Sequence, residues 1–166
     1  PVLNLYSFMK LPYRKEIDGL RALAVVSIIL FHAGFKVFEG GYVGVDVFFV
    51  ISGYLITSLL INEREANDRI SIRDFYARRA RRLLPISVVV LAVTALASAI
   101  WLQPTRLSAL ANDIMAAAAF SVNFVFAHRG TDYLQAAMEP SAIQHYWSLA
   151  VEEQFYMVWP GLIALV

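Results

Sequence analysis

The first apolar segment of the chain reads Gly19-Leu20-Arg21-Ala22-Leu23-Ala24-Val25-Val26-Ser27-Ile28-Ile29-Leu30-Phe31-His32, with an arginine and a histidine inside it. Eleven helical steps of 100° return to within ~20° of the starting direction and climb roughly 16 Å, so Arg21 and His32 share one helix face about half a bilayer apart. Such groups cost roughly 2.5 kcal/mol or more in hydrocarbon and usually face a polar cavity or pathway. The pair therefore predicts an internal polar cleft. The alternative is an arginine that snorkels to the headgroups and a histidine bonded to a neighbouring helix.

The composition is that of a membrane protein. Hydrophobic residues make up 59% of the chain and charged residues only 16%. There is no cysteine, which excludes disulfides, thiolate catalysis and cysteine-ligated metals within this chain. The chain begins at Pro1 and is still apolar at Val166, so we expect a piece of a longer polytopic protein.

Five apolar stretches define the expected fold, each near the ~20 residues that cross a bilayer. They run from about Asp18 to Phe35, from Val45 to Ile61, from Leu83 to Leu102, from Leu110 to Ala127, and from Ile143 onward. We therefore expect an all-α, polytopic transmembrane helical bundle with about five spans, a short cytoplasmic amphipathic helix and no sheet. Residues 1–166 would form a single partial transmembrane domain.

Local signals refine these bounds. The capping-box pattern from Ser71 to Asp74 predicts the start of the short helix, and a second one from Ser141 to Gln144 predicts the start of the fifth span. Pro160 falls inside that span and would kink it unless another group satisfies the freed carbonyl.

The distribution of Lys and Arg predicts an orientation. The N-terminal stretch has Lys10, Arg14, Lys15 and Arg21, and the loop from 63 to 82 has seven arginines. The turns at 36–44 and 103–109 carry only Lys36 and Arg106. By the positive-inside rule the N-terminus and the arginine loop face the cytoplasm. Four successive crossings would then return residues 128–144 to the cytoplasm.

The arginine cluster Arg78-Arg79-Ala80-Arg81-Arg82 directly precedes the third span. Basic residues at this boundary set topology and attract anionic lipid, at about 1 kcal/mol each. Guanidinium forks also suit phosphate oxygens, so a phosphate site for a polyanionic cofactor is the second reading. Nucleic acid is not an expected partner, because the cluster lies at a membrane boundary among aromatic residues typical of an interfacial belt.

The fifth segment carries its own polar stripe. His145, Ser148 and Glu152 follow one another at helical spacing, with Glu153 beside them. Two carboxylates entering a span need a cation, and we expect Arg21 or an arginine of the cluster at 78–82 as the partner.

Two other chemistries are not favoured for these residues. A Ser-His-acid hydrolase would need a strand-turn-helix around Ser148, which this sequence does not predict. A metal site built from His32, His128, His145 and a glutamate is possible by residue type, but no ligand spacing supports it. We expect no metal.

Four motifs occur together in the order and spacing of one membrane-enzyme family. They are Arg21 with His32; Gly40-Gly41-Tyr42-Val43-Gly44-Val45-Asp46-Val47-Phe48-Phe49-Val50-Ile51-Ser52-Gly53-Tyr54-Leu55-Ile56; Phe75-Tyr76-Ala77-Arg78-Arg79-Ala80-Arg81-Arg82-Leu83-Leu84-Pro85; and His145-Tyr146-Trp147-Ser148-Leu149-Ala150-Val151-Glu152-Glu153-Gln154-Phe155-Tyr156. Across residues 13–166 the chain resembles the membrane acyltransferase-3 family, of the O-antigen acetylase type.

The resemblance implies a multi-pass enzyme of the bacterial inner membrane. Such an enzyme takes an acetyl or other short acyl group from cytoplasmic acetyl-CoA or another acyl-CoA. It transfers the group to a hydroxyl of a surface polysaccharide, glycolipid or similar acceptor, lipopolysaccharide among them. Members have about ten spans, so the chain would cover about the first half of the membrane domain.

The residues suit that chemistry. His32 is the expected catalytic base or acyl carrier, because imidazole can be neutral near pH 7. Arg21 could hold the thioester or pyrophosphate of the donor, and Arg78, Arg79, Arg81 and Arg82 could hold its phosphates. Glu152 and Glu153 could orient an arginine or the histidine. Asp46 lies where a helix N-terminus stabilises an anion, which is a structural role.

Two rival classes use the same residues. A transporter or proton-pathway component would also need intramembrane charges, but it does not require an arginine cluster at a cytoplasmic entrance. A membrane scaffold would tolerate removal of the charges within its spans.

Overall fold

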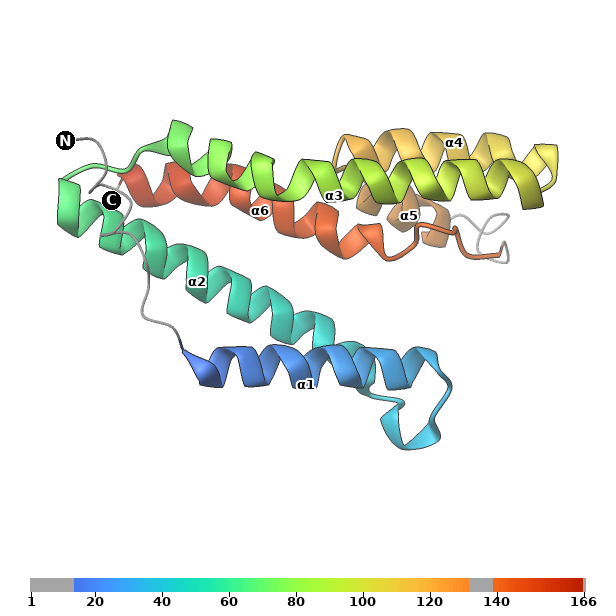
Figure 1. Ribbon diagram of the computed structural model, residues 1–166, viewed down its shortest axis with the longest axis horizontal. Helices are drawn as coiled ribbons and strands as arrows, with labels where there is room; N and C mark the ends of the chain where they lie inside the picture. Colours follow the sequence, from blue (N-terminus) through green and yellow to red (C-terminus); the bar gives the residue numbers. More distant parts are fainter. Residues whose placement is uncertain (1–13, 132–138, 166) are drawn as a thin grey trace. The chain divides into compact units, whose positions relative to one another are not determined.

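The computed structural model describes residues 14–131 and 139–165. Its elements in chain order are α1 (Lys15–His32), the 3-10 turns η1 (Lys36–Phe38) and η2 (Gly41–Val43), α2 (Gly44–Asn67), α3 (Ile72–Trp101), α4 (Pro104–Ala118), α5 (Val122–Thr131) and α6 (Tyr146–Leu165) (Figure 1). Every regular element in the described ranges is helical, which confirms the all-α prediction. Lys10 lies outside the described ranges, and so do residues 132–138 of the segment 128–144 that was predicted to return to the cytoplasm.

The described residues divide into two compact units. The first contains α1, both 3-10 turns, α2 and the last turns of α6 from Trp159. The second runs from Ser71 to Val158 and contains α3, α4, α5 and most of α6. Each is described by itself.

In the first unit, α1 packs against the start of α2 through glycine. A Cβ on Gly41 would lie 2.2 Å from the carbonyl oxygen of Ser27, and one on Gly44 would lie 2.6 Å from the carbonyl oxygen of Ala24. Both glycines are buried. Figure 1 shows α1 and α2 converging at the end that carries them. Small residues of this kind let two helix backbones approach closely without a hydrophobic driving force.

Helix α1 ends at His32, three residues before the predicted boundary at Phe35. Gly34 adopts φ +78°, a conformation that L side chains rarely take. The Gly34 amide donates to the carbonyl of Phe31, and the Phe35 amide donates to the carbonyl of Leu30. This is a Schellman ending, and it makes His32 the last helical residue of α1.

Helix α2 continues past the predicted boundary at Ile61 to Asn67. The extra residues include Glu63, Arg64 and Ala66, which are good helix formers, and the helix stops where Asp68 takes φ 55°. The last turns of α6 bond to α2 in this unit. The Trp159 indole donates to the hydroxyl of Thr57 at 2.8 Å, and Arg64 donates to the carbonyl of Ile163 at 3.0 Å.

In the second unit, α3 is one helix of 30 residues. The prediction of a separate short cytoplasmic helix is therefore wrong, because the helical phase continues through Pro85 into the third span. The capping-box start is right, since Ser71 is the N-cap, although its hydroxyl donates to Asp74 at 2.7 Å instead of accepting a backbone N–H.

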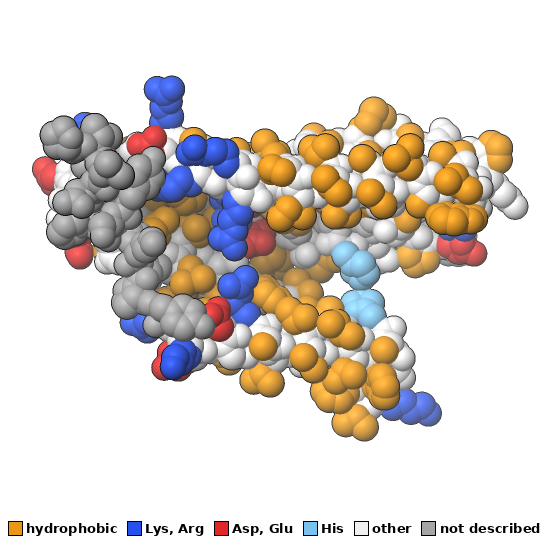
Figure 2. Space-filling view, in the orientation of Figure 1, with side chains coloured by type: hydrophobic (Ala, Val, Ile, Leu, Met, Phe, Trp, Pro, Cys, Tyr) orange, Lys and Arg blue, Asp and Glu red, His pale blue; other side chains and the backbone are white. Residues whose placement is uncertain are grey.

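The surface of α3 changes character along its length. Figure 2 shows Lys and Arg side chains gathered at one end of this helix and hydrophobic side chains over the rest. The outward apolar residues are 41–78% exposed: Leu84, Ile86, Val88, Val89, Val90, Val93, Leu96, Ile100 and Trp101. So many exposed apolar side chains along one helix are typical of a membrane-facing surface. Among the described helices, Gly41–Asn67 and Ile72–Trp101 are long and apolar enough to cross a bilayer.

The predicted fourth span, Leu110–Ala127, is not one helix. It is broken between α4 and α5, where Phe120 takes φ 51°. The Phe120 and Ser121 amides donate to the carbonyls of Ala117 and Ala116, so a Schellman ending forms without glycine.

The break turns the chain back on itself. Asp113 of α4 pairs with Arg129 of α5, and Arg106 pairs with Glu139 at 2.5 Å. Glu139 therefore lies at the end of this unit where α3 finishes, away from the arginine cluster. For the described residues, the prediction that the chain returns to the side of the cluster before the fifth segment is wrong, since α4 and α5 form a hairpin and Glu139 lies near the other end of α3.

Helix α6 consequently runs antiparallel to α3. Tyr146 bonds to the carbonyl of Ser87 at 3.3 Å, and Tyr76 bonds to that of Met157 at 2.6 Å. The capping box at Ser141 does not start α6, because the helix begins five residues later and the Ser141 hydroxyl has no partner among the described residues. Pro160 lies inside α6, and the Tyr76 hydroxyl binds a carbonyl in the turn that this proline weakens.

We predict that Gly41→Ala destabilises the full-length protein by about 1–3 kcal/mol or more, because the new methyl group meets the backbone of α1. Gly40→Ala is the matched control, since a Cβ there meets nothing within 4 Å. The measurement is the thermal unfolding of both variants in detergent. Equal unfolding temperatures would contradict the close approach of α1 and α2.

The hairpin of α4 and α5 predicts which loops share a membrane side. In a full-length protein with any native cysteines replaced, Thr105→Cys and Glu139→Cys should react with an impermeant maleimide from one side. Arg73→Cys should react from the other. Labelling of Glu139→Cys together with Arg73→Cys would show that α4 and α5 cross the bilayer.

Candidate functional site

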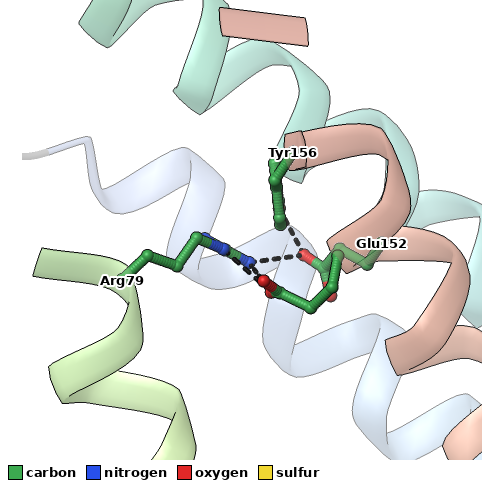
Figure 3. A network of polar contacts seen from close by, with 4 residues as sticks. Arg79, Glu152 and Tyr156 are labelled. Atoms are coloured by element: carbon green, nitrogen blue, oxygen red, sulfur yellow. Dashed lines mark hydrogen bonds and ion pairs between the residues drawn. The ribbon is translucent and has the colours of Figure 1, made fainter. Parts of the chain in front are cut away.

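Arg79 of α3 is held by two consecutive glutamates of α6 (Figure 3). Its Nε donates to Glu153 Oε1 at 2.8 Å, and its Nη2 lies 2.7 Å from the same oxygen. Nη2 is also 3.8 Å from Glu152 Oε1. Glu153 is only 7% exposed, so this ion pair is screened from water. The expectation that an arginine of the cluster pairs with these carboxylates is confirmed, and Arg79 is that arginine.

Tyr156 completes the contact. Its ring centroid lies 3.3 Å from the Arg79 guanidinium carbon, and its hydroxyl donates to Glu152. The residue is 2% exposed. One turn of α6 therefore places a carboxylate and an aromatic face on the same arginine, since Glu152 and Tyr156 are four residues apart. Sequence analysis did not single out Tyr156, although its i+4 spacing from Glu152 was visible.

His32 stands at the last turn of α1 in the first unit, with an exposed side chain. Its Nδ1 lies 2.8 Å from the carbonyl oxygen of Ile28. A carbonyl can only accept, so Nδ1 carries a proton and the lone pair of the neutral ring is on Nε2. The Phe31 ring meets the imidazole edge-on at 5.1 Å. The Schellman ending at Gly34 and the Ile28 carbonyl together set the orientation of this ring.

Arg21 lies on the same helix and forms a loose ion pair with Asp18 at 3.7 Å. Its side chain is 45% exposed, so the pair contributes little and leaves the guanidinium able to take another anion. Arg21 and His32 thus keep the shared helix face that the sequence predicted. Whether that face lines a cleft stays a prediction.

The four arginines of the cluster have different surroundings. Arg81 and Arg82 are exposed, while Arg78 and Arg79 are partly buried. The Nε of Arg81 donates to the carbonyl of Ala77 at 3.1 Å. Asp46 is exposed in the first turn of α2, where the helix dipole favours an anion.

The polar stripe of the fifth segment is divided in the structure. His145 lies in the turn before α6, and Ser148 donates to the His145 carbonyl at 3.1 Å. Glu152 faces Arg79 and Tyr156 instead of Ser148. The described contacts therefore give Ser148 no nucleophile geometry.

Two buried polar contacts escaped sequence analysis. Asp113, 2% exposed, faces both terminal nitrogens of Arg129, at 3.0 Å to Nη1 and 2.6 Å to Nη2. Gln154 donates to the carbonyl of Phe120 at 2.7 Å and to Asn123 at 2.9 Å. The first contact joins α4 to α5, and the second holds this hairpin against α6.

We predict that Tyr156→Leu destabilises the full-length protein more than Tyr156→Phe does. Phenylalanine loses the bond to Glu152, at about 1.5–3 kcal/mol, and leucine also loses the ring under Arg79, at about 0.5–2 kcal/mol. Urea unfolding of the detergent-solubilised variants measures the difference. Equal losses would show that the ring contributes nothing to Arg79.

The chain is similar to curated proteins over most of its length. It is 40% identical over 151 residues to the peptidoglycan O-acetyltransferase OatA of Listeria monocytogenes, covering 91% of this chain and 24% of that protein. It is 41% identical over 155 residues to the O-acetyltransferase OatA of Staphylococcus aureus strain NCTC 8325, covering 93% of this chain and 25% of that protein. The chain thus spans about a quarter of the length of these relatives. No solved structure matches it.

The family profile described as an acyltransferase domain matches residues 14–166, which is nearly all of the chain. That range contains His32, the arginine cluster and the paired glutamates of α6. The chain belongs to the acyltransferase-3 family and forms a piece of its acyltransferase domain.

Proposed function

We propose that the full-length protein is a membrane-embedded O-acyltransferase that moves an acetyl or short acyl group from acyl-CoA to a hydroxyl of a surface glycan. The observation that carries this proposal is the family match over 14–166, together with relatives named as O-acetyltransferases at 40–41% identity. One relative is named for peptidoglycan, so a peptidoglycan hydroxyl is the first acceptor to test.

His32 is the proposed reacting group. Nδ1 bonds to the Ile28 carbonyl, so Nε2 is the nitrogen that we propose for the chemistry. As a base, Nε2 takes the proton of the acceptor hydroxyl while that oxygen attacks the thioester carbonyl and the CoA thiolate leaves. As a carrier, Nε2 itself attacks the thioester carbonyl and the CoA thiolate leaves. The acceptor hydroxyl then takes the acyl group, and its proton passes to the released imidazole. Both steps use the same nitrogen.

The donor is proposed to bind through arginine. Arg81 and Arg82 are exposed and suit the phosphates of acyl-CoA. The weak pair of Arg21 with Asp18 leaves Arg21 able to hold the thioester or pyrophosphate.

The proposed location is the bacterial inner membrane, with the N-terminus and the arginine cluster in the cytoplasm. The seven arginines between residues 63 and 82 support this orientation. A cytoplasmic cluster would meet acyl-CoA where it is made, and the glycan acceptor would be reached from the other side.

The test is acyl transfer to peptidoglycan by the full-length protein in membrane vesicles. His32→Ala should lower kcat about 100-fold to 10,000-fold with insertion unchanged, because the base is lost and the helix is kept. Arg21→Ala should also lower transfer, through the donor. His128→Ala, at an exposed position of α5, is the matched control.

Two outcomes would contradict the proposal. Full activity of His32→Ala would remove the histidine from the reaction. A wild-type protein that consumes no acyl-CoA would favour a transporter or proton-pathway component.

A further inference from the structure

The four arginines of the cluster have different surroundings, so they do not share one function. On α3, Arg78, Arg81 and Arg82 follow the i, i+3, i+4 spacing of one helix face. Arg79 projects about 100° from Arg78, toward α6. The antiparallel packing of α3 and α6 fixes the direction of Arg79. The bond from Tyr76 to Met157 holds the two helices together close to Arg79.

The Arg79 guanidinium is largely occupied within the protein. Two of its three nitrogens face Glu153, and one of these is also near Glu152. Its flat face lies on the Tyr156 ring at 3.3 Å. The Nε–Nη2 edge of the guanidinium is taken by Glu153, and the two nearby carboxylates offset the positive charge that attracts a phosphate, so Arg79 suits a phosphate less well than the exposed arginines do.

We infer that Arg79 is a positioning residue that acts through Glu153, and that phosphate binding falls to Arg81 and Arg82. This inference rests on the proposed acyl transfer. According to this inference, one unit of four side chains sets the register of α6 against α3. Its members are Arg79, Glu152, Glu153 and Tyr156. The donor touches the exposed arginines on the neighbouring face of α3.

The same unit gives Glu153 a structural role. One oxygen of Glu153 meets two nitrogens of Arg79, at 2.7 Å from Nη2 and 2.8 Å from Nε. In this inference Glu153 serves to hold Arg79 in place.

The experiment compares Arg79→Gln, Glu153→Gln, the double variant and Arg82→Gln in the full-length protein. The two readouts are steady-state kinetics with acetyl-CoA, at matched amounts of folded protein, and thermal unfolding in detergent. Arg73→Gln is the control, because Arg73 is exposed on the first turn of α3 and outside the unit.

A positioning role predicts that Arg79→Gln and Glu153→Gln each lower kcat about tenfold to a hundredfold. The KM for acetyl-CoA should stay within about twofold, since the ground state loses no phosphate contact. The double variant should be no slower and no less stable than the worse single variant, because both changes break the same contact. Arg82→Gln should instead raise KM about tenfold with kcat unchanged.

The opposite pattern overturns the inference. If Arg79→Gln raised KM as Arg82→Gln does, while Glu153→Gln did not, Arg79 would be a phosphate ligand. Additive losses of unfolding temperature in the double variant would also overturn it, whether or not the protein is active. Absence of acyl transfer by the wild type would contradict the proposed function alone, since the unfolding readout needs no activity.

Discussion

The ion pair between Arg79 and Glu153 is the contact on which the arrangement of α3 and α6 depends. A charge carried into apolar surroundings is costly unless it is paired and hydrogen-bonded. Glu152 and Glu153 enter α6 within one turn, and Arg79 faces both of them with Tyr156 beneath it. An antiparallel α6 displaced by one turn would leave these carboxylates opposite the apolar residues that follow the cluster. The pairing of charge therefore selects one register among several that apolar packing would accept.

The same constraint explains how a helix can be broken within an apolar segment. Where α4 ends, Phe120 adopts a left-handed conformation that costs roughly 1–2 kcal/mol for a residue with a side chain. The amide of Gln154 binds the Phe120 carbonyl and reaches Asn123 of α5. Irregular backbone at membrane depth is tolerated where protein satisfies it. Three consecutive residues of α6, Glu152 to Gln154, thus face polar groups of α3, of α5 and of the turn between α4 and α5.

Local sequence determined part of the fold well. The apolar runs located the helices, and the start of α3 followed from the capping pattern at Ser71. The end of α1 had a readable signal in Gly34, which our placement at Phe35 overlooked. The break at Phe120 had none, because neither glycine nor proline is present there, and its partner Gln154 lies 34 residues away. Hydropathy therefore predicted one helix over 110–127 where the structure has two, and the predicted direction of α6 relative to α3 was wrong with it.

The sequence predicted which residues belong to the candidate site, but it did not predict which of them contact each other. Sequence alone selected Arg21, His32, the arginine cluster and the two glutamates. It could not say which arginine meets Glu153, since that depends on the register of α6 against α3, with which the bond from Tyr76 to Met157 agrees. It also could not say which imidazole nitrogen holds the proton, which depends on the rotamer that brings Nδ1 to Ile28.

The most direct test of this account is a structure of the full-length protein with a non-hydrolysable thioether analogue of acetyl-CoA. The account predicts that the acyl carbonyl carbon lies about 3–3.5 Å from Nε2 of His32, the distance of a reactive approach. It also predicts phosphates on Arg81 and Arg82 while Arg79 stays on Glu153. An acyl group remote from His32, or Arg79 turned from Glu153 onto a phosphate, would contradict it.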